Sequence, residues 1–599
     1  MSLNFDNFNS VVELFEKQAS TCPDRPYLWR KMEAGYEPLS WQNVRNRVVS
    51  FATALKNIGI LEGDRVVIVS ENRPEWQIAD LAIMSLGAIT VPAYTTSTAN
   101  DYEYIINHSG ARCAIVSNHA LAQKIMPALA KSQNCKNLIK LDDDGEKYDL
   151  PVSIDFYNEL VLEYGRDNSD LINLSEHTNR HKRKDTACII YTSGTGGNPK
   201  GVMLSHGAML TNCEGAKHLL HDITSNLQEI RFLSWLPLSH SYEHTLQFYI
   251  IGIGAQIYYA ESIDKLLVNM AEAKPHFMTA VPRFYESLHT RISQGLKKQS
   301  KISQFFFKET LRIGKKIYFN QKLSSYEKIL NSILNKIVRK KVNKRFGGNL
   351  KALVSGGAAL NFQVGIYLSS LGLPLLQGYG QTETAPVVSA NPPHKIKLDT
   401  VGTIFKGTKV KIAEDGEILV SGENVMNGYW NDPEATSKTL IDGWIHTGDI
   451  GELDEEGYLK ITDRKKDIIV NAGGDNISPS RIEEKLNIEP MISQSMVHGD
   501  FKNYLVAIIV PEREFLKQWA KENNKEFEIK SINNDVDFIK LVSDTVEKIN
   551  KNLSVIERIR KFLLINEEFT IENDMMTPTM KVRRFKVKEK YKDDLEKLY

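Results

Sequence analysis

The first third of the chain alternates short apolar runs with stretches of helical periodicity. The run RVVIVS (65–70) predicts a buried strand, and EWQIADLAIMSLGA (75–88) places apolar side chains at helical spacing. AITVPAY (88–94) and CAIVSN (113–118) predict further strands, and ACIIYTSG (187–194) predicts a strand that runs into a glycine loop. Strands separated by helices indicate parallel sheets, because a crossover helix returns the chain to the same end of the sheet. The sequence therefore predicts an α/β fold with mixed parallel sheets.

Composition limits the size and the class of the protein. The chain has 599 residues, 42% of them hydrophobic, and this length predicts two to four domains. A net charge of +1 argues against bulk attraction to nucleic acid. Five scattered cysteines without a CxxC pair indicate neither a disulfide framework nor a zinc site, and they predict a reduced, cytoplasmic location. The N-terminus lacks the pattern of a signal peptide, and the most apolar run, residues 248–260, is shorter than the ~20 residues that span a membrane.

A charged run divides the chain into two parts. Glycines and short predicted strands dominate residues 401–460, and DRKKD (463–467) follows them. Beyond this run lie strands such as YLVAIIVP (504–511) and then charged helices. A solvated run suits a hinge, because hinge residues change their backbone angles with little loss of packing. We predict a large multi-subdomain N-terminal domain over residues 1–462, a hinge at 463–467 and a small, mobile α+β domain over 468–599.

Residues 291–346 form a basic insertion of predicted helices. They contain sixteen Lys or Arg residues and only two acidic residues, Glu309 and Glu327. Aromatic side chains, such as those of FFF (305–307), accompany the positive charge. Three interpretations remain open: a solvated insertion, a peripheral contact with an anionic membrane, or a dock for a polyanionic cofactor. The second interpretation places the protein at the inner face of a membrane.

The stretch YTSGTGGNPKG (191–201) has the composition of a phosphate-binding loop. Glycines let backbone N–H groups approach an anion without a clash from Cβ, and hydroxyl and ammonium groups donate further bonds. The stretch departs from the P-loop pattern GxxxxGK[ST], since Pro199 precedes its lysine and Gly201 follows it. The alternative interpretation is a surface turn. The candidate nucleotide-contacting residues are Thr192, Ser193, Gly194, Thr195, Gly196, Gly197 and Lys200.

Two further glycine-containing motifs lie downstream. QGYGQTET (377–384) follows an apolar strand and offers an aromatic ring for stacking on a base, together with a carboxylate that suits Mg²⁺. GWIHTGD (443–449) places a carboxylate after a glycine turn, where it can accept two hydrogen bonds from a sugar diol. Each motif by itself is also compatible with an ordinary turn.

In this order, the three motifs resemble the adenylate-forming superfamily of acyl-CoA synthetases, peptide-synthetase adenylation domains and luciferases. SGGAAL (355–360), DRKKDIIVNAGGDNISPSRIEE (463–484) and TPTMKVRR (577–584) extend the resemblance over nearly the whole chain. The family loop is usually YTSGTTGxPKG, so Gly196 stands where the family has a second Thr. The resemblance implies ATP, Mg²⁺ and coenzyme A as cofactors.

The resemblance also assigns roles to individual residues. It implies that Tyr379 stacks on adenine, that Thr382 contacts the α-phosphate and that Glu383 binds Mg²⁺. It further implies that Lys581 activates adenylation and that Lys466 lies at the hinge. The remaining implied contacts are Gly357 and Ala358 along the adenine edge, Gln377, Gly378 and Gly380 elsewhere around the nucleotide, Asp449 and Arg464 at the ribose, and Gly473 and Gly474 at the pantetheine of coenzyme A.

The implied reaction has two steps. A carboxylate attacks the α-phosphorus of ATP and expels pyrophosphate, and coenzyme A then attacks the acyl-adenylate and releases AMP. Lys581 lies far beyond the predicted hinge in the sequence, so the small domain must close to deliver it and then move away to admit the thiol.

The stretch LPLSHSYE (236–243) bears on the choice of acid. It contains His240, a candidate for the acyl pocket, and it lacks the Asp that pairs with the substrate amine in amino-acid-activating relatives. This stretch and VPRFYESL (281–288) look like the long-chain fatty acid–CoA ligases. A structural histidine is the alternative for His240, and medium-chain or aryl acids remain alternative substrates. Transfer of the acyl group to a carrier protein, a kinase-like ATPase and an inactive scaffold are the competing functions.

Overall fold

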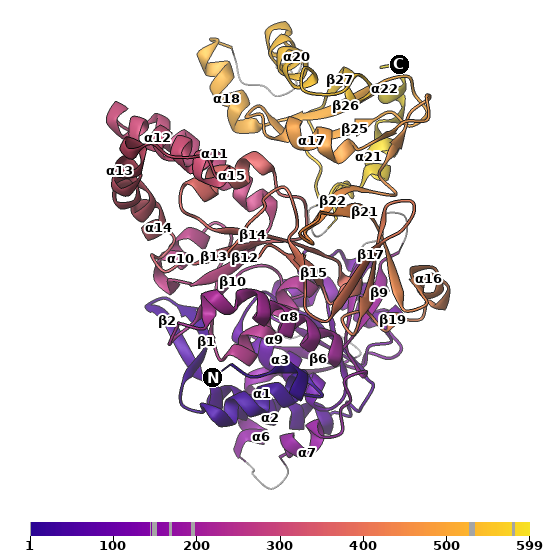
Figure 1. The fold of residues 1–599 in the computed structure, drawn as a ribbon. Coiled ribbons are helices and arrows are strands. Elements are labelled where there is room, and N and C mark those ends of the chain that lie inside the picture. The colour runs from indigo at the N-terminus through magenta and orange to yellow at the C-terminus, as the bar shows by residue number, and fades with distance from the viewer. Residues whose placement is uncertain are drawn as a thin grey trace.

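The computed structural model describes residues 2–143, 145, 152–166, 171–192, 198–525, 534–577 and 581–599. Figure 1 shows a large body and, above it, a small domain coloured orange to yellow. The body contains two large sheets and a third, smaller sheet. The small domain contains a three-stranded sheet and a two-stranded hairpin. This division into a large N-terminal and a smaller C-terminal α/β part is the one that the sequence predicts.

An eight-stranded sheet forms one half of the body, in the order β19-β9-β8-β4-β3-β5-β6-β7. Its strands are β3 (Arg65–Val69), β4 (Ile89–Pro92), β5 (Cys113–Val116), β6 (Asn137–Lys140), β7 (Ser153–Phe156), β8 (Thr186–Thr192), β9 (Lys200–Ser205) and β19 (Gly428–Tyr429). The strands from β8 to β7 run parallel, while β9 is antiparallel to β8 and to β19. The mixed parallel sheet predicted from RVVIVS and its successors is therefore confirmed.

A nine-stranded sheet forms the other half, in the order β16-β15-β14-β13-β12-β10-β11-β1-β2. Its strands are β1 (Pro26–Met32), β2 (Gly35–Ser40), β10 (Arg231–Ser234), β11 (Gln256–Tyr259), β12 (Phe277–Ala280), β13 (Ala352–Ser355), β14 (Leu375–Gly380), β15 (Val387–Ala390) and β16 (Thr403–Ile404). The central strands β11, β10, β12, β13 and β14 are parallel. Their carboxyl ends therefore meet at one edge, where loops after parallel strands form binding sites.

Helices α3 (Pro74–Ser85), α8 (His206–Thr224) and α9 (Ser241–Ile253) contribute to one continuous core that reaches both large sheets. Every residue of α3 is buried, which explains why its sequence is apolar on more than one face. Helices α4 (Ala99–Ser109) and α5 (His119–Lys131) cover the other face of the eight-stranded sheet. Other helices of the body are α1 (Val11–Thr21), α2 (Trp41–Asn57), α6 (Tyr157–Arg166), α7 (Leu174–Thr178), α10 (Leu266–Ala273), α15 (Phe362–Ser370) and α16 (Pro433–Thr439).

The third sheet of the body leads into the small domain. It contains β17 (Thr408–Ile412), β18 (Glu417–Gly422), β21 (Trp444–Leu453), β20 (Leu440–Ile441) and β22 (Leu459–Arg464), the last paired with β21. The small domain is built from β23 (Ile469–Val470), β24 (Asn476–Ile477), β25 (Ile492–His498), β26 (Leu505–Pro511), β27 (Ile559–Leu564), α17 (Pro479–Asn487), α18 (Arg513–Glu522), α20 (Val536–Asn550), α21 (Arg584–Lys590) and α22 (Lys592–Glu596). All seven residues of β26 are buried, because separate cores cover its two faces.

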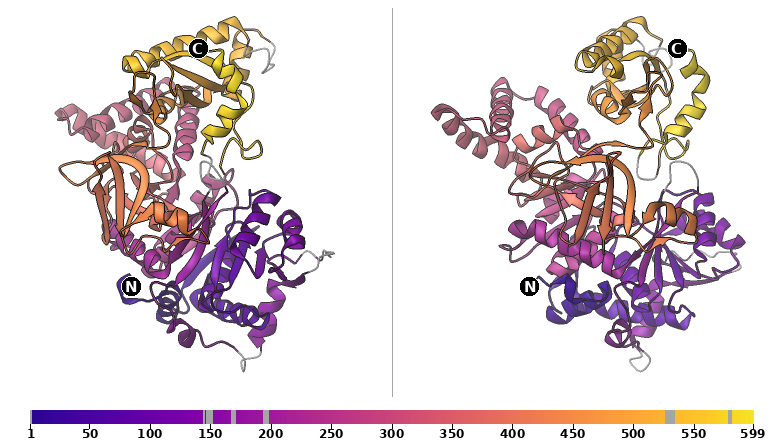
Figure 2. Two further views of the ribbon diagram at one scale, coloured as in Figure 1. Left: turned by 90° about the vertical axis from the view of Figure 1, so that its right-hand side faces the viewer. Right: turned by 45° about the vertical axis from the view of Figure 1, so that its right-hand side comes forward.

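The residues predicted as a basic insertion, 291–346, are mostly helical, and position 291 is not the start of a helix. That position falls inside α11 (Pro282–Lys297), which begins directly after β12. The insertion continues through α12 (Lys301–Tyr318), α13 (Ser325–Leu334), the π-helical turn Asn335–Arg339 and α14 (Lys340–Arg345). These helices project from one side of the body (Figures 1 and 2). Within the described ranges, no helix has both the length and the apolar character needed to cross a membrane.

Candidate active site

The turns after β13 and β14 lie side by side, because these two strands are paired in parallel. Gly357 and Ala358 occupy the turn after β13. Gly357 has φ +84°, a left-handed angle that favours glycine. At the end of β14, a Cβ atom on Gly380 would lie 1.8 Å from the carbonyl oxygen of Pro386. Glycine at position 380 therefore allows the chain to double back towards β15.

Two buried polar atoms at this edge have no hydrogen-bond partner among the described residues. They are Oγ of Ser355 and Oε1 of Gln377, and the side chains of both residues are almost completely buried. A buried polar atom without a partner costs about 1–3 kcal/mol. Because the two residues are adjacent across β13 and β14, these atoms mark a place where a polar ligand would supply the missing bonds. Gly378 follows Gln377 and packs closely against the backbone of Ser389.

Tyr379 joins this edge to the third sheet of the body. Its hydroxyl donates a 2.7 Å hydrogen bond to Oδ2 of Asp449, and Nε of Arg464 lies 3.0 Å from Oδ1 of the same carboxylate. Asp449 and Arg464 are direct cross-strand neighbours on β21 and β22. Asp449 is buried and lies within β21, directly after Gly448. Each carboxylate oxygen keeps a free lone pair for a further donor.

Thr382 and Glu383 lie on the short 3₁₀ turn Thr382–Thr384 that follows β14. The hydroxyl of Thr382 lies 3.2 Å from that of Ser241 at the start of α9. Oε1 of Glu383 accepts a 2.8 Å hydrogen bond from the hydroxyl of Tyr429. The ammonium group of Lys200 stands 4.7 Å from the centre of the Tyr429 ring. The hydroxyl of Tyr429, the carboxylate of Glu383 and the ammonium group of Lys200 come from three distant segments and lie in one region.

Lys581 comes from the small domain and reaches the same region. Its pKa is lowered from 10.5 to about 8, first by desolvation and then by the charge of Arg464, while Asp449 and Glu383 oppose the shift. The side chain of Lys581 remains exposed to solvent. Its backbone is held by a loop closure, since Thr577 N donates to the Lys581 carbonyl oxygen at 2.8 Å. The structure therefore gathers Lys581, Glu383, Asp449 and Arg464 at the junction of the two domains.

His240 caps the N-terminus of α9, where its Nδ1 accepts a hydrogen bond from the backbone of Tyr242. Burial and, to a smaller extent, the charge of Lys581 lower the pKa of His240 from 6.5 to about 4. The imidazole is therefore neutral at physiological pH. His240 has a structural role as a helix cap, and it lies close enough to Lys581 for the positive charge of the lysine to lower its pKa.

A buried carboxylate lies behind this capping histidine. Glu243 accepts hydrogen bonds from the hydroxyls of Ser234, at 2.7 Å, and Thr279, at 2.6 Å. These bonds tie α9 to β10 and β12 beneath the candidate site. Desolvation raises the pKa of Glu243 to about 7, although the two hydroxyls oppose the shift. In addition, the indole of Trp235 donates to the Thr279 carbonyl oxygen at 2.7 Å. The sequence indicated no positioning role for Glu243.

Two other residues of the site were also missed in the sequence. Ser241 is part of LPLSHSYE but carries no distinguishing pattern of its own. Tyr429 lies 46 positions from the Glu383 that it contacts. Only the pairing of β19 with β9 brings Tyr429 there, and no local pattern in the sequence reports that pairing.

Part of the predicted glycine loop lies outside the described residues, namely Ser193, Gly194, Thr195, Gly196 and Gly197. The two ends of the loop are described. Thr192 ends β8 and lies directly opposite Lys200, which begins β9. The loop therefore connects two antiparallel strands, and its lysine end lies beside Tyr429 and Glu383.

The predicted hinge lies between two anchored residues. On the body side, Lys465 donates from its backbone to Gly448 and forms an ion pair with Glu417 at 3.0 Å. On the small-domain side, Asp467 lies 3.8 Å from Arg584. Lys466 stands exposed between them.

The two glycines assigned to the pantetheine do not join the other site residues. Gly473 and Gly474 lie in the turn between β23 and β24, on the small domain. Gly474 has φ +84° and open space around its Cα, and the backbone of Gly473 donates to Asn471. In this arrangement the turn is separate from the cluster around Lys581.

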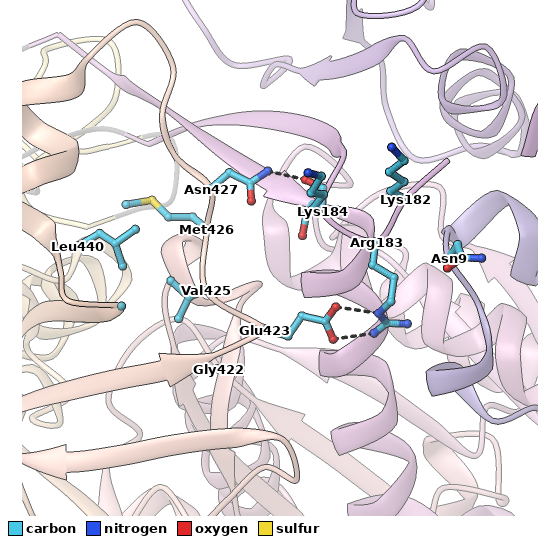
Figure 3. A pocket seen from close by; sticks show the side chains of 12 residues that line it. Asn9, Lys182, Arg183, Lys184, Gly422, Glu423, Val425, Met426, Asn427 and Leu440 are labelled. Carbon is cyan, nitrogen blue, oxygen red and sulfur yellow. Dashed lines mark hydrogen bonds and ion pairs between the residues drawn. The ribbon is translucent and has the colours of Figure 1, made fainter. Parts of the chain in front are cut away.

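A surface hollow of about 620 Å³ lies elsewhere, lined by the segment before β8 and by residues that follow β18 (Figure 3). Arg183 forms a forked ion pair with Glu423 there, at 2.7 and 2.8 Å. Asn427 donates to the carbonyl oxygen of Lys184. These contacts join the third sheet to the segment before β8, so the hollow is a structural junction. It shares no residue with the cluster around Tyr379.

Comparison with known proteins identifies the family. The AMP-binding enzyme model matches residues 15–430, and the AMP-binding enzyme C-terminal domain model matches residues 466–599. The chain is 31% identical to Long-chain-fatty-acid--CoA ligase FadD15 of Mycobacterium bovis, covering 99% of this chain and 97% of that protein. It is 28% identical to Long-chain-fatty-acid--[acyl-carrier-protein] ligase AEE15, chloroplastic, of Arabidopsis thaliana, covering 100% of this chain and 88% of the relative.

The fold agrees with solved structures. The adenylation domain of a carboxylate reductase from Mycobacterium chelonae superposes with a TM-score of 0.76 at 21% identity, covering 98% of this chain and 91% of the other. The two family matches together span nearly the whole sequence, on both sides of the predicted hinge. The chain belongs to the AMP-binding enzyme family, within the adenylate-forming superfamily.

Proposed function

We propose that this enzyme activates a long-chain fatty acid with ATP and transfers the acyl group to coenzyme A. The observation that carries the proposal is the convergence of Tyr379, Asp449, Arg464, Glu383 and Lys581 where the two domains meet. Tyr379 suits the base, and Asp449 with Arg464 suits the ribose diol. Lys581 suits the phosphates, and Glu383 suits a divalent cation.

The nucleotide half of the site binds the adenosine of ATP. The ring of Tyr379 stacks on adenine, and Gly357 and Ala358 lie along its edge. The orphaned amide oxygen of Gln377 is available to a donor on the base. The buried carboxylate of Asp449, oriented by Tyr379, accepts hydrogen bonds from the ribose hydroxyls. Arg464 balances its charge and contacts the same sugar.

The phosphate half supports the transfer itself. The carboxylate of the fatty acid attacks the α-phosphorus, and pyrophosphate leaves. Thr382 donates to the α-phosphate, while the loop of residues 193–197 and Lys200 hold the outer phosphates. Lys581 offsets negative charge that spreads over the phosphate oxygens in the transition state. Because Lys581 arrives with the small domain, adenylation requires the arrangement seen here.

The residues at the site fit a magnesium ion. Mg²⁺ is usually held in proteins by one or two carboxylates together with substrate phosphates and water. Glu383 supplies one such carboxylate, and among the described residues no cluster of three or more acidic, histidine or cysteine ligands competes for a metal. Mg²⁺ would neutralise phosphate charge, and Tyr429 orients the Glu383 side chain for it.

We propose that the second half-reaction uses a different domain arrangement. The boundaries proposed from the sequence are a body of residues 1–462, a hinge at 463–467 and a mobile domain of residues 468–599. Rotation at Lys466, which lies between the anchored Lys465 and Asp467, carries Lys581 away. The turn with Gly473 and Gly474 then faces the pantetheine, where the absence of side chains permits close approach. The thiol attacks the acyl carbon, and AMP leaves.

Two relatives bear on the acid and the acceptor. The 31% identical relative is named a long-chain-fatty-acid–CoA ligase, which supports a long-chain acid and coenzyme A. Another relative is named an acyl-carrier-protein ligase, so loading of a carrier protein is the second candidate. Medium-chain and aryl acids remain the alternative substrates, since the depth of the acyl pocket beside His240 decides the length of chain that fits. We place the protein in the cytoplasm by the sequence prediction.

The test is a series of saturated acids of increasing length, assayed for pyrophosphate and AMP with coenzyme A and with an acyl carrier protein. Formation of acyl-CoA with a maximum of kcat/KM at long chains supports the proposal. Release of ADP in place of AMP refutes adenylate chemistry, and thioester formed only on the carrier protein favours the second candidate. A control assay without fatty acid measures any release of pyrophosphate that does not depend on the acid.

A further inference from the structure

The basic insertion, residues 291–346, concentrates the positive charge of this protein. Its sixteen Lys or Arg residues and two Glu residues give it a charge of +14, whereas the whole chain carries +1. The rest of the chain therefore carries a net charge of −13. In Figure 1 and in the right-hand view of Figure 2 the helices of the insertion extend from one side of the body.

One face of the insertion is fixed to the body. Gly314 of α12 packs so closely on α15 that a Cβ atom there would lie 2.4 Å from the side chain of Ser370. The guanidinium of Arg339 donates to the Ser370 carbonyl oxygen at 2.8 Å and to Asn331 at 2.8 Å. A small core between α12 and α13, centred on Leu334, lies behind these contacts. The insertion is therefore a firmly attached structure with a defined outer face.

The outer face carries large apolar side chains in contact with solvent. On α13 and the π-helical turn, Tyr326, Ile329, Ile333 and Ile337 follow one another at spacings of three or four residues and are 42–66% exposed. This spacing places them along one side of the helix. Four more exposed apolar residues come from α12 and its C-terminal end: Ile302, Phe305, Ile317 and Phe319. We call these eight residues the apolar stripe.

Lysines flank the apolar stripe. Lys328 and Lys336 directly precede Ile329 and Ile337 in sequence, and Lys340 lies one turn further along. All three lysines are exposed, and none forms an ion pair within the described part of the chain. The two glutamates of the insertion are already used, since Glu309 pairs with Arg312, and Glu327 pairs with Arg312 and with Lys316. Most of the positive charge is therefore available to an external partner.

We propose that the apolar stripe and its lysines dock this enzyme on the surface of an anionic lipid bilayer. A helix that exposes apolar residues beside lysines lies in the interface of a membrane, with the apolar side among the acyl chains and the ammonium groups at the phosphates. A folded acidic partner, such as a carrier protein, would match the charge but does not require eight exposed apolar side chains. The proposal does not depend on the identity of the acid.

The attachment to α11 connects the proposed membrane face with the candidate active site. β12 ends at Ala280, whose carbonyl oxygen accepts a hydrogen bond from Gly356 in the turn beside the site. α11 begins at Pro282 and has sixteen residues, which corresponds to a length of about 24 Å. α12, the first helix that lies wholly within the insertion, follows at its far end. Docking would therefore hold the site about one helix length from the lipid surface that contains long-chain acids.

The test uses the full-length enzyme and sedimentation with vesicles of phosphatidylcholine alone or mixed with phosphatidylglycerol. We expect binding to the mixed vesicles that weakens at high salt. The charge variant Lys328→Gln/Lys336→Gln/Lys340→Gln is expected to bind on the order of 100-fold more weakly, since each lysine near an anionic surface contributes about fivefold. The apolar variant Ile329→Ser/Ile333→Ser keeps the charge and is expected to lose tenfold or more.

A matched control is Leu61→Ser/Ile263→Ser, which removes two apolar side chains elsewhere on the body that are at least as exposed on average. We expect this control to bind vesicles like the wild type. Pyrophosphate release with a soluble short-chain acid, in the absence of vesicles, is expected to be unchanged in all variants and reports correct folding. Equal binding of wild type and both insertion variants overturns the proposal. Binding to an acidic carrier protein but to neither vesicle also overturns it, in favour of a protein partner.

Discussion

The hydroxyl of Tyr379 donates a 2.7 Å hydrogen bond to Asp449, seventy positions further along the chain. The two residues belong to different sheets, so the bond locks the proposed adenine platform to the proposed ribose ligand. Arg464 holds the other oxygen of the carboxylate at 3.0 Å. The platform and the ribose ligand are therefore oriented before nucleotide binds.

This relationship predicts unequal effects at its two ends. Asp449→Ala removes the acceptor and leaves Arg464 unpaired, so we expect kcat/KM for ATP to fall by about 10–100-fold. Tyr379→Phe keeps the ring and removes one hydrogen bond, and we expect a loss of about fivefold. Steady-state pyrophosphate release at varied ATP measures both. An equal loss in the two variants would show that the hydroxyl does more than orient the carboxylate.

The position of Lys581 predicts a separation of the two half-reactions. Lys581→Ala removes a charge that acts on the phosphates, and we expect adenylation to slow by about 10²-fold or more. Thioester formation from preformed acyl-adenylate is expected to remain near the wild-type rate, because the proposed domain rotation carries Lys581 away from the site before that step. Single-turnover assays with acyl-adenylate and coenzyme A provide the comparison. Equal slowing of both half-reactions contradicts alternation of the domains.

The lowered pKa of Lys581 predicts an alkaline limit for ATP use. Because this pKa lies at about 8, the amine loses its proton as the pH rises through that value, and kcat/KM for ATP is expected to fall about tenfold per pH unit beyond it. In Lys581→Arg the guanidinium stays charged, so we expect the fall to disappear even if the absolute rate is lower. If kcat/KM for ATP still falls at alkaline pH in the arginine variant, the fall is caused by the titration of another group.

Two carboxylates that face each other across the domain junction predict a second effect of pH. Desolvation, Glu286 on α11 and Glu483 raise the pKa of Glu484 on α17 from 4.5 to about 7, with Lys485 opposing. The pKa of Glu286 is also raised by burial, although Arg283 lowers it. In an open arrangement Glu484 would have its usual pKa. The raised pKa therefore stabilises the closed arrangement relative to the open one, and this stabilisation is complete below the usual pKa of Glu484. That advantage is lost as the pH rises through about 7.

Glu484→Gln removes the ionising group. We expect the variant to adenylate about threefold to tenfold faster than the wild type above neutral pH, given that one pKa unit corresponds to a factor of ten. The rates are expected to converge at acidic pH. Single-turnover pyrophosphate release over a pH series measures the difference. Glu514→Gln, an exposed change on α18 of the same domain, is the control and is expected to follow the wild type.

An exposed aromatic ring beside the two-glycine turn predicts a contact for the acceptor. Phe501 is 81% exposed and has φ +57°, and its backbone N–H donates to Val470 at 2.8 Å. We expect Phe501→Ala to raise KM for coenzyme A about tenfold through loss of ring packing, while the rate of acyl-adenylate formation stays the same. Phe501→Trp keeps a ring and is expected to restore the KM. An unchanged KM in the alanine variant would exclude Phe501 from the acceptor site.

Much of the fold could be predicted from local pattern. The strands of the eight-stranded sheet are short apolar runs between turn residues, and burial on both faces makes such runs apolar throughout. The start of α11 at Pro282 is not marked in the sequence as the start of the basic insertion, because α11 continues past residue 291 without a break in helical pattern. The position of Asp449 inside β21 was likewise hidden, since Gly448 adopts a turn-like φ within a continuous strand.

The motifs determined by themselves which side chains are candidates for nucleotide chemistry, because glycine turns, a stacking ring and isolated charges are local properties of the sequence. Only the tertiary structure decided which of them meet. Tyr379 reaches Asp449 through the contact of two sheets, and Tyr429 reaches Glu383 through the pairing of β19 with β9. Lys581 comes near Asp449, Glu383 and Arg464 through the placement of the small domain. The same holds for the apolar stripe: its residues are visible in the sequence, but exposure depends on which helix face packs against α15. Periodicity shows that a face is apolar, whereas the packing of distant elements decides whether that face is covered.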